Sequence, residues 1–587
     1  MTISEAINRY KDNMKEADAL TDALFTKEDK DEWIKALEVR AERLSNLYEE
    51  DNKLIDFIFN EIDKLEPENM DLVYDALYSL YNEGYDDSFV LIPILEKLED
   101  YYRKNNNYEK LIVACSIHSY ESHEYVSRID PTVPFNIDLY KEVLKQKVHY
   151  SEIENPKVRA DIFVGYFNVI VASESIPGIS PIDSYNYLLE AEELYNSDEF
   201  KKVDSDNEDI KGMMEEIRQG FLVFAGRYNE LTDEIKDFIY ERSLFYINKD
   251  DLYKSPLLPF LAYNRCLYEK GIITKDEILK RCDVYFKPMI EEFGKKEIVD
   301  EDIATAFEAM SLVLDILSLD GEADINHYYN LMKKFFKMAD ARKFAKITPY
   351  INSLLADFVL KSLPFEHDKE EIEQSLFDNL IKTQAPTYIH SVMVMKIAEL
   401  IYSYMDKSLL PKLGNPHEFI TNSALLHDIG KSKITAIINL QRRKLSNFEF
   451  TGIKNHPAFG IDIITKNKLL TEYHDVIIGH HKSYDGKSGY PKDFDNTKSE
   501  YKIIIDLITI ADCLDAATDK YGRNYKHPKS VKDVILEFEA GSGTLYNPYF
   551  VDLLKNNKDL ITKLEDLTEL KRPEYMYKAY IKTGIFD

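Results

Sequence analysis

The stretch His427-Asp428-Ile429-Gly430-Lys431 decides how this chain of 587 residues is organised. It follows an apolar helical run that ends in Ala424-Leu425-Leu426. A histidine beside an aspartate at the end of an apolar element is costly to bury unless something binds both. A metal ion would do so, because the imidazole offers a neutral nitrogen and the carboxylate an oxygen that can bridge two ions. Alone, the five residues also fit a solvated helix end.

The rest of the C-terminal third favours the metal site. Histidines and aspartates recur there at the starts, ends and buried faces of predicted helices, where an unpaired polar group costs about 1–3 kcal/mol. Seven ligands exceed the four of a structural zinc ion and suit two octahedral ions that share a bridging aspartate and a bridging water. The seven candidate ligands are His390, His427, Asp428, His456, His480, His481 and Asp512.

Composition excludes several other classes of function. The net charge of -31 argues against a DNA- or RNA-binding surface, which needs clustered lysine and arginine, but not against a small anionic ligand. The chain is 44% hydrophobic and 30% charged, a normal globular balance, and its length predicts two to four domains. No CxxC pair occurs among Cys115, Cys266, Cys282 and Cys513, so a zinc knuckle or a disulfide framework is not expected.

The sequence also predicts where the protein resides. Residues 1–5 lack the basic and apolar regions of a signal peptide. No apolar run reaches the roughly 18 residues that a spanning helix needs. We therefore expect a cytoplasmic protein without membrane contact.

The pattern of residues 1–360 predicts an all-α fold with a regulatory or interaction role. Apolar and aromatic residues recur at three- and four-residue steps, and helices joined by short turns suggest stacked pairs. Residues 106–111 and 184–195 loosely resemble tetratricopeptide repeats, although no strict 34-residue period exists and a plain helical domain is an equal alternative. A helical-repeat-like solenoid over 1–360, a junction near 360–375 and a second helical domain over 370–587 are expected.

The second domain resembles a known family. His390 before an apolar helix, HDIGK at 427–431, His456-Pro457, HHKSYDGKSGYP at 480–491 and ADCLDAATDKYGRNY at 511–525 stand in the order of the HD-GYP phosphodiesterases. This is a branch of the HD metal-dependent phosphohydrolases, and the match covers a little over one third of the chain. The resemblance implies a helical bundle that hydrolyses a cyclic dinucleotide, chiefly cyclic di-GMP, to a linear dinucleotide or mononucleotide.

The resemblance also implies roles for individual residues. The seven candidates would hold two divalent ions, iron, manganese or similar, with Asp428 as the bridge. The catalytic group would be His427, Asp428 and Lys431, with Lys431 on a substrate phosphate. The substrate would also meet Gly489, Tyr490, Pro491, Arg523 and Lys526. Apart from the resemblance, Asp515 shares a predicted helix face with Asp512, so it would orient a ligand or Lys431, or else lie at a polar rim.

Departures from the family leave alternatives open. Lys482 stands where the family usually has glutamate, the loop at 486–491 carries an extra residue, and two residues are inserted near Gly522. These changes put loop geometry and substrate choice in doubt. The alternatives are a catalytically weak cyclic-dinucleotide receptor, a phosphohydrolase of another nucleotide, or a helical scaffold. Regulation would come from a protein or peptide partner on the N-terminal helices, or from self-association as a homodimer.

Overall fold

The computed structural model describes most of the chain, namely residues 1–27, 29–129, 138–172, 180–293, 312–313, 316–317, 359–360, 363–434, 442–522 and 528–582. Over these residues the prediction of an all-α fold is confirmed: α-helices and short helical turns form the structure, no strand is present, and two isolated bridges pair Lys482 with Gly489 and Ser542 with Tyr546. In the same ranges, no helix is both long enough and apolar enough to cross a membrane.

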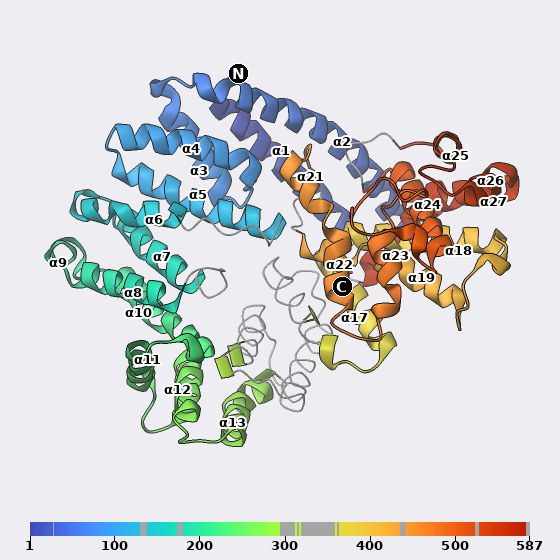
Figure 1. The fold of residues 1–587 in the computed structure, drawn as a ribbon. Coiled ribbons are helices and arrows are strands. Elements are labelled where there is room, and N and C mark those ends of the chain that lie inside the picture. The colour runs from blue at the N-terminus through green and yellow to red at the C-terminus, as the bar shows by residue number, and fades with distance from the viewer. Residues whose placement is uncertain are drawn as a thin grey trace. The chain divides into compact units, whose positions relative to one another are not determined.

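The chain divides into two compact units (Figure 1). Unit 1 combines residues 1–60, 82–85 and 337–587, so the first two helices belong with the C-terminal ones. The predicted junction near 360–375 stays a prediction. The α-helices of unit 1 are α1 (Ile3–Phe25), α2 (Lys30–Glu61), α17 (Lys369–Thr383), α18 (Ala385–Tyr404), α19 (Pro416–Leu426), α21 (Asn447–Ile453), α22 (His456–Ile464), α23 (His474–Gly479), α24 (Lys502–Thr518), α25 (Val531–Ala540), α26 (Pro548–Asn556), α27 (Lys558–Glu565) and α28 (Arg572–Lys582).

Unit 2 covers residues 61–81 and 86–336. Helices close in sequence pack on one another, as α4 (Ser88–Lys104) does on α5 (Tyr108–Ile129), α6 (Asp138–Lys145) on α7 (Pro156–Ala172) and α11 (Asp233–Tyr246) on α12 (Leu257–Glu269). Side-chain caps begin several of them: Asp87 accepts from the backbone N–H of Phe89 at α4, and Ser180 forms a capping box with Asp183 at α8. The α-helices are α3 (Met70–Asn82), α4 (Ser88–Lys104), α5 (Tyr108–Ile129), α6 (Asp138–Lys145), α7 (Pro156–Ala172), α8 (Pro181–Asn196), α9 (Asp198–Asp204), α10 (Glu208–Gly220), α11 (Asp233–Tyr246), α12 (Leu257–Glu269) and α13 (Lys275–Phe293).

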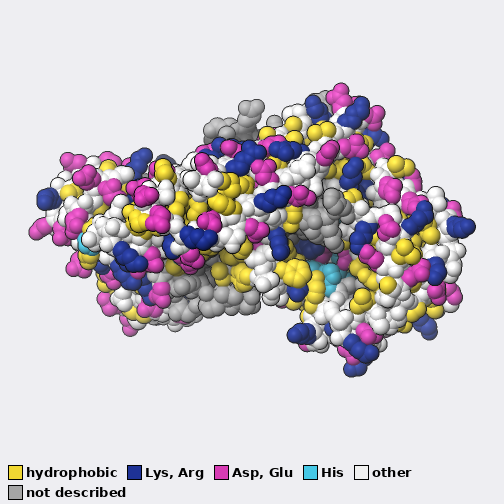
Figure 2. Space-filling view, turned by 90° about the horizontal axis from the view of Figure 1, so that it is seen from above, with side chains coloured by type: hydrophobic (Ala, Val, Ile, Leu, Met, Phe, Trp, Pro, Cys, Tyr) yellow, Lys and Arg dark blue, Asp and Glu magenta, His cyan; other side chains and the backbone are white. Residues whose placement is uncertain are grey.

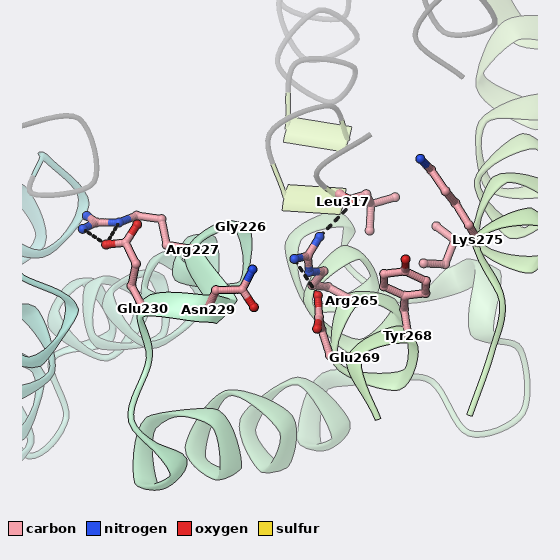
Figure 3. A pocket seen from close by; sticks show the side chains of 10 residues that line it. Gly226, Arg227, Asn229, Glu230, Arg265, Tyr268, Glu269, Lys275 and Leu317 are labelled. Carbon is pink, nitrogen blue, oxygen red and sulfur yellow. Dashed lines mark hydrogen bonds and ion pairs between the residues drawn. The ribbon is translucent and has the colours of Figure 1, made fainter. Parts of the chain in front are cut away.

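Unit 2 contains a cavity of about 320 Å³ lined by side chains of both charges (Figure 3). Arg265 is buried there and binds Glu269 and the carbonyl of Leu317, while Arg227 binds Glu230. Each carboxylate of the lining thus already has an arginine partner. The cavity is therefore built largely from internally satisfied ion pairs.

Helix α18 is the centre of unit 1. It packs against α17, α19, α24 and α28, and its apolar residues Met393, Val394, Ile397 and Ile401 are fully buried. Burying such side chains is worth roughly 1.5–3 kcal/mol each. Because α18 also carries His390 one turn from its start, the best-packed helix of the unit positions one of the predicted ligands.

Candidate metal centre

Five of the predicted ligands lie at or next to helix ends, namely His427, Asp428, His456, His480 and His481. The other two, His390 and Asp512, lie within α18 and α24. Helix α19 stops at Leu426, and Asp428 adopts φ -103° and ψ 11°, outside the helical region, before a short 3-10 turn at Ile429–Lys433. His456 begins α22, and His480 follows the last residue of α23. Because the backbone leaves the helical path after Leu426, the adjacent side chains of His427 and Asp428 can both point into the cluster.

Gly430 brings the turn after Asp428 against the start of α22. A Cβ atom at Gly430 would lie 1.9 Å from the carbonyl oxygen of His456 and 2.5 Å from the backbone nitrogen of Gly460. Only glycine permits this approach of two backbones. The contact fixes the distance between Asp428 and His456, whose Oδ1 and Nε2 atoms are 3.1 Å apart.

Asp428 lies between two groups of histidines. Its Oδ2 atom is 3.5 Å from His390 Nε2 and 3.4 Å from His427 Nε2. Its Oδ1 atom is 3.1 Å from His456 Nε2 and 3.8 Å from His480 Nε2. Each oxygen of one carboxylate thus faces a different pair of imidazoles. A bridging carboxylate has this arrangement.

Asp512 and His481 complete the two groups. Asp512 Oδ1 is 3.0 Å from His390 Nε2, and its Oδ2 is 3.9 Å from His481 Nδ1. One group of possible ligand atoms belongs to His390, His427 and Asp512, and the other to Asp428, His456, His480 and His481; within each, the atoms lie within 4.8 Å of one another. All seven predicted ligands therefore come together. Histidine side chains also gather at one place on the face shown in Figure 2, where acidic groups are scattered widely.

Four of the histidines are held in one orientation by their Nδ1 atoms. Nδ1 donates to the carbonyl three residues earlier in His427 (2.6 Å), His456 (2.6 Å) and His480 (2.7 Å). In His390 it donates to Asp515 Oδ2 at 2.7 Å. A proton on Nδ1 leaves the lone pair on Nε2, and that atom faces Asp428 in all four. The second hydrogen bond of each ring is the usual support of a metal-ligating histidine.

The charge states also suit a cation. Burial lowers the pKa of His456, takes that of His480 well below its usual value, and together with His456 lowers the pKa of His481 to about 3. These three rings are neutral at pH 7. Burial alone would raise the pKa of Asp428, but the neighbouring charge of Lys431 holds this pKa well below its ordinary value. Neutral imidazole and ionised carboxylate are the forms that bind metal.

His390 shows how strong the negative potential of the site is. Burial opposes a charge on this ring, yet the neighbouring carboxylates of Asp512 and Asp515 raise its pKa to about 9. Burial likewise opposes a charge on Asp512, yet the neighbouring imidazole of His390 holds the pKa of that carboxyl well below its usual range. The carboxylates thus attract positive charge, whether a proton or a metal ion supplies it.

Several buried atoms of the cluster lack a partner. His390 Nε2, His427 Nε2 and Asp428 Oδ1 form no hydrogen bond, and such atoms are costly to bury. Cations bound between them would satisfy all three. The two buried His/Asp groups are therefore consistent with metal binding.

Comparison with known proteins agrees with this geometry. Residues 387–517 match the HD domain family. The C-terminal part of the chain contains an HD domain.

The relatives of the chain carry related names. A cyclic di-GMP phosphodiesterase of Thermotoga maritima is 27% identical over 268 residues, which are 44% of this chain and 71% of that protein. A 3'3'-cGAMP-specific phosphodiesterase of Vibrio cholerae is 31% identical over 144 residues, which are 24% of this chain and 27% of that protein. A cyclic di-GMP phosphodiesterase response regulator of Xanthomonas campestris is 30% identical over 138 residues, which are 23% of this chain and 35% of that protein. The chain thus covers only about a third or less of the length of the last two relatives.

The remaining predicted site residues of the HD domain fall into three places. Lys431 is part-buried, and its Nζ atom is 2.5 Å from Asp428 Oδ2. Tyr490 packs against His481 with ring centroids 4.5 Å apart, so the loop that contains Gly489, Tyr490 and Pro491 adjoins the cluster. Arg523 and Lys526 lie outside the described residues.

Lys482 has a role that the sequence did not indicate. Its side chain is buried, and Nζ donates to the carbonyl of Pro491 at 3.1 Å. The neighbouring Gly489 has φ +87°, and a Cβ atom there would lie 2.0 Å from the carbonyl oxygen of His481. Lys482 and Gly489 therefore hold the loop beside His481 within the HD domain. Lys482, which departs from the family pattern, thus stabilises the loop through its hydrogen bond to Pro491.

Proposed function

We propose that this protein is a metal-dependent phosphodiesterase that hydrolyses a cyclic dinucleotide, with cyclic di-GMP as the substrate. One observation carries the proposal: the two oxygens of Asp428 face two separate sets of imidazoles that have their Nε2 lone pairs available. A site for a single ion would not need a carboxylate whose two oxygens face different sets of imidazoles. The names of the relatives support the substrate class.

The ligands of the two ions would be the seven predicted residues. His390, His427 and Asp512 would hold one ion, His456, His480 and His481 the other, and Asp428 both. When bound, divalent cations such as manganese or iron supply Lewis acidity that activates a water molecule and offsets charge on the phosphate. The chain itself fixes the geometry, because the backbone carbonyls and Asp515 orient four of the imidazoles.

Lys431 and the loop at 486–491 would position the substrate. Lys431 lies at the edge of the cluster, where its ammonium group can meet a non-bridging phosphate oxygen and offset the charge that grows there during reaction. Tyr490 beside His481 offers an aromatic face to a base. Arg523 and Lys526 would add phosphate contacts, and the product is a linear dinucleotide or a mononucleotide.

Turnover with a ligand-deficient control tests the proposal. The protein purified with manganese should convert cyclic di-GMP to linear product, and His427→Ala combined with Asp428→Ala should abolish both metal uptake and turnover. Intact substrate after long incubation, with two bound ions verified, rejects the enzyme. Tight binding without turnover would identify a receptor instead, and activity only on other compounds in a substrate panel would identify a different phosphohydrolase.

The N-terminal helices would regulate this activity. In unit 2, helices close in sequence pack in order, an arrangement that supports a repeat-like scaffold for a protein or peptide partner. The cytoplasm is the proposed location, and a homodimer is the proposed form of self-association. Light scattering on the full chain tests the last point: a monomer at every concentration used for the activity assay excludes regulation by dimerisation.

A further inference from the structure

Asp515 supports the cluster without belonging to either group of possible ligands. It lies one helical turn after Asp512 on α24, and its side chain is fully buried. Its Oδ2 atom accepts from His390 Nδ1 at 2.7 Å. A carboxylate has no proton to give, so this contact places the proton on Nδ1 and turns Nε2 toward Asp428 and Asp512.

Arg572 holds the other oxygen of Asp515. It is the first residue of α28, directly after a π-helical turn at Asp566–Lys571, and only 1% of it is exposed. Its Nη2 atom donates to Asp515 Oδ1 at 2.6 Å and to Thr518 Oγ1 at 3.2 Å, and its Nε atom donates to the carbonyl of Thr568. Burial of a guanidinium group is costly without such partners. π-Helical turns are rare and often occur at functional sites.

Helix α28 is itself braced by α2. Trp33 of α2 is fully buried, and its ring lies 5.5 Å from that of Tyr577 and 5.8 Å from that of Tyr580, centroid to centroid. Both tyrosines belong to α28, and Lys30 of α2 pairs with Glu574 of the same helix. A line of direct contacts therefore runs from α2 through α28 and Arg572 to Asp515 and His390.

We propose that Arg572 is a positioning residue for His390, that it acts through Asp515, and that the N-terminal helix α2 holds it in place. This inference rests on the proposed two-cation centre. Through these contacts, a change in the position of α2 would alter the position of His390, one of the proposed metal ligands. The N-terminal part of the chain would thereby influence metal binding. Removing an outer partner of a ligating histidine typically weakens metal binding about 10–100-fold.

Manganese titration of the full chain, followed through the electron paramagnetic resonance signal of free Mn²⁺, tests the route without any need for turnover. Asp515→Asn keeps the shape of the side chain but cannot accept charge-assisted bonds from both His390 and Arg572. We expect one of two manganese sites to weaken 10–100-fold and the other to change less than threefold, because only one group contains His390. Arg572→Met should weaken the same site.

The double variant separates positioning from general damage. Because Arg572 acts through Asp515, Asp515→Asn with Arg572→Met should bind manganese within about threefold of Asp515→Asn alone. Asp506→Asn is the matched control, since Asp506 is a buried carboxylate on the same helix that binds Asn547 and Lys502. It should leave both sites within about twofold of wild type. If Arg572→Met does not fold, Arg572→Lys is used in its place. Lysine keeps the positive charge but lacks the several N–H donors of the guanidinium group.

The outcomes distinguish this inference from the proposed function. Two manganese ions bound with unchanged affinity in Asp515→Asn would overturn the route and leave the proposed function intact. Equal weakening of both sites, or additive losses in the double variant, would also overturn it. A wild-type protein that binds no manganese would instead reject the two-cation centre on which both depend.

Discussion

Replacement of Gly430 by alanine would separate the two halves of the cluster. The added Cβ would lie 1.9 Å from the carbonyl oxygen of His456, and an ordinary contact needs 3.4 Å or more. The neighbouring atoms are backbone, so no side-chain rotation relieves the clash, and the turn and the start of α22 must move apart by about 1.5 Å. Asp428 lies on one side of this contact and His456 on the other, with Oδ1 and Nε2 now 3.1 Å apart.

The displacement exceeds what metal coordination tolerates. Ligand distances vary by about 0.2 Å in working sites, and a 1 Å misplacement can cost about 100-fold in rate. We therefore expect Gly430→Ala to lose about 100-fold or more in manganese affinity at the group that contains Asp428 and His456. Overpacking should also lower the free energy of unfolding by about 1–3 kcal/mol.

Manganese titration and thermal unfolding of the same preparations measure both effects. Gly414→Ala is the matched control, because nothing lies within 4 Å of a Cβ atom at Gly414. It should leave metal affinity unchanged. Wild-type affinity for both ions in Gly430→Ala would refute the reasoning, since the close approach would then not set the ligand positions.

Three further perturbations test other parts of the account. Lys431→Met should reduce turnover of cyclic di-GMP about 100–1,000-fold while manganese affinity does not fall, because in the proposed mechanism the ammonium group offsets charge on the phosphate and does not bind the cation. Lys433→Met, which removes a surface pair with Asp462, should change neither turnover nor manganese affinity in the same measurements. Lys482→Met should raise KM about tenfold with little change in kcat, since it frees the loop end at Pro491 from a charged donor; a fall in kcat alone would contradict this. Burial raises the pKa of Asp161 to about 6, so the folded protein holds a proton that the unfolded chain has released, and stability falls as the pH rises from about 4 through 6. Asp161→Asn should therefore stabilise unit 2 by about 1–3 kcal/mol at pH 7.5 and not at pH 4 in thermal unfolding, and an equal gain at both values would contradict the assignment.

The sequence was informative about the cluster because its members occur in short local patterns. HDIGK follows an apolar helix, and His456 and the pair His480-His481 stand at helix boundaries. Those boundaries are local properties of the chain, and the structure brings all seven predicted ligands together. Their roles as ligands stay a prediction until a metal is observed.

The supporting contacts could not be read in the same way. Arg572 follows Asp515 by 57 positions, and no pattern in either segment indicates that the two pair. The brace between Trp33 and the tyrosines of α28 joins opposite ends of the chain, and hydrophobic periodicity predicts a buried face but not its partner. From the sequence, Lys482 is only a departure from the family pattern, because its hydrogen bond to Pro491 depends on the path of the intervening loop.

A manganese anomalous difference map from crystals of the protein tests the central claim most directly. The account predicts two peaks about 3.5–4 Å apart, with Asp428 bridging them and histidines on either side. A single peak, or peaks away from Asp428, would contradict it.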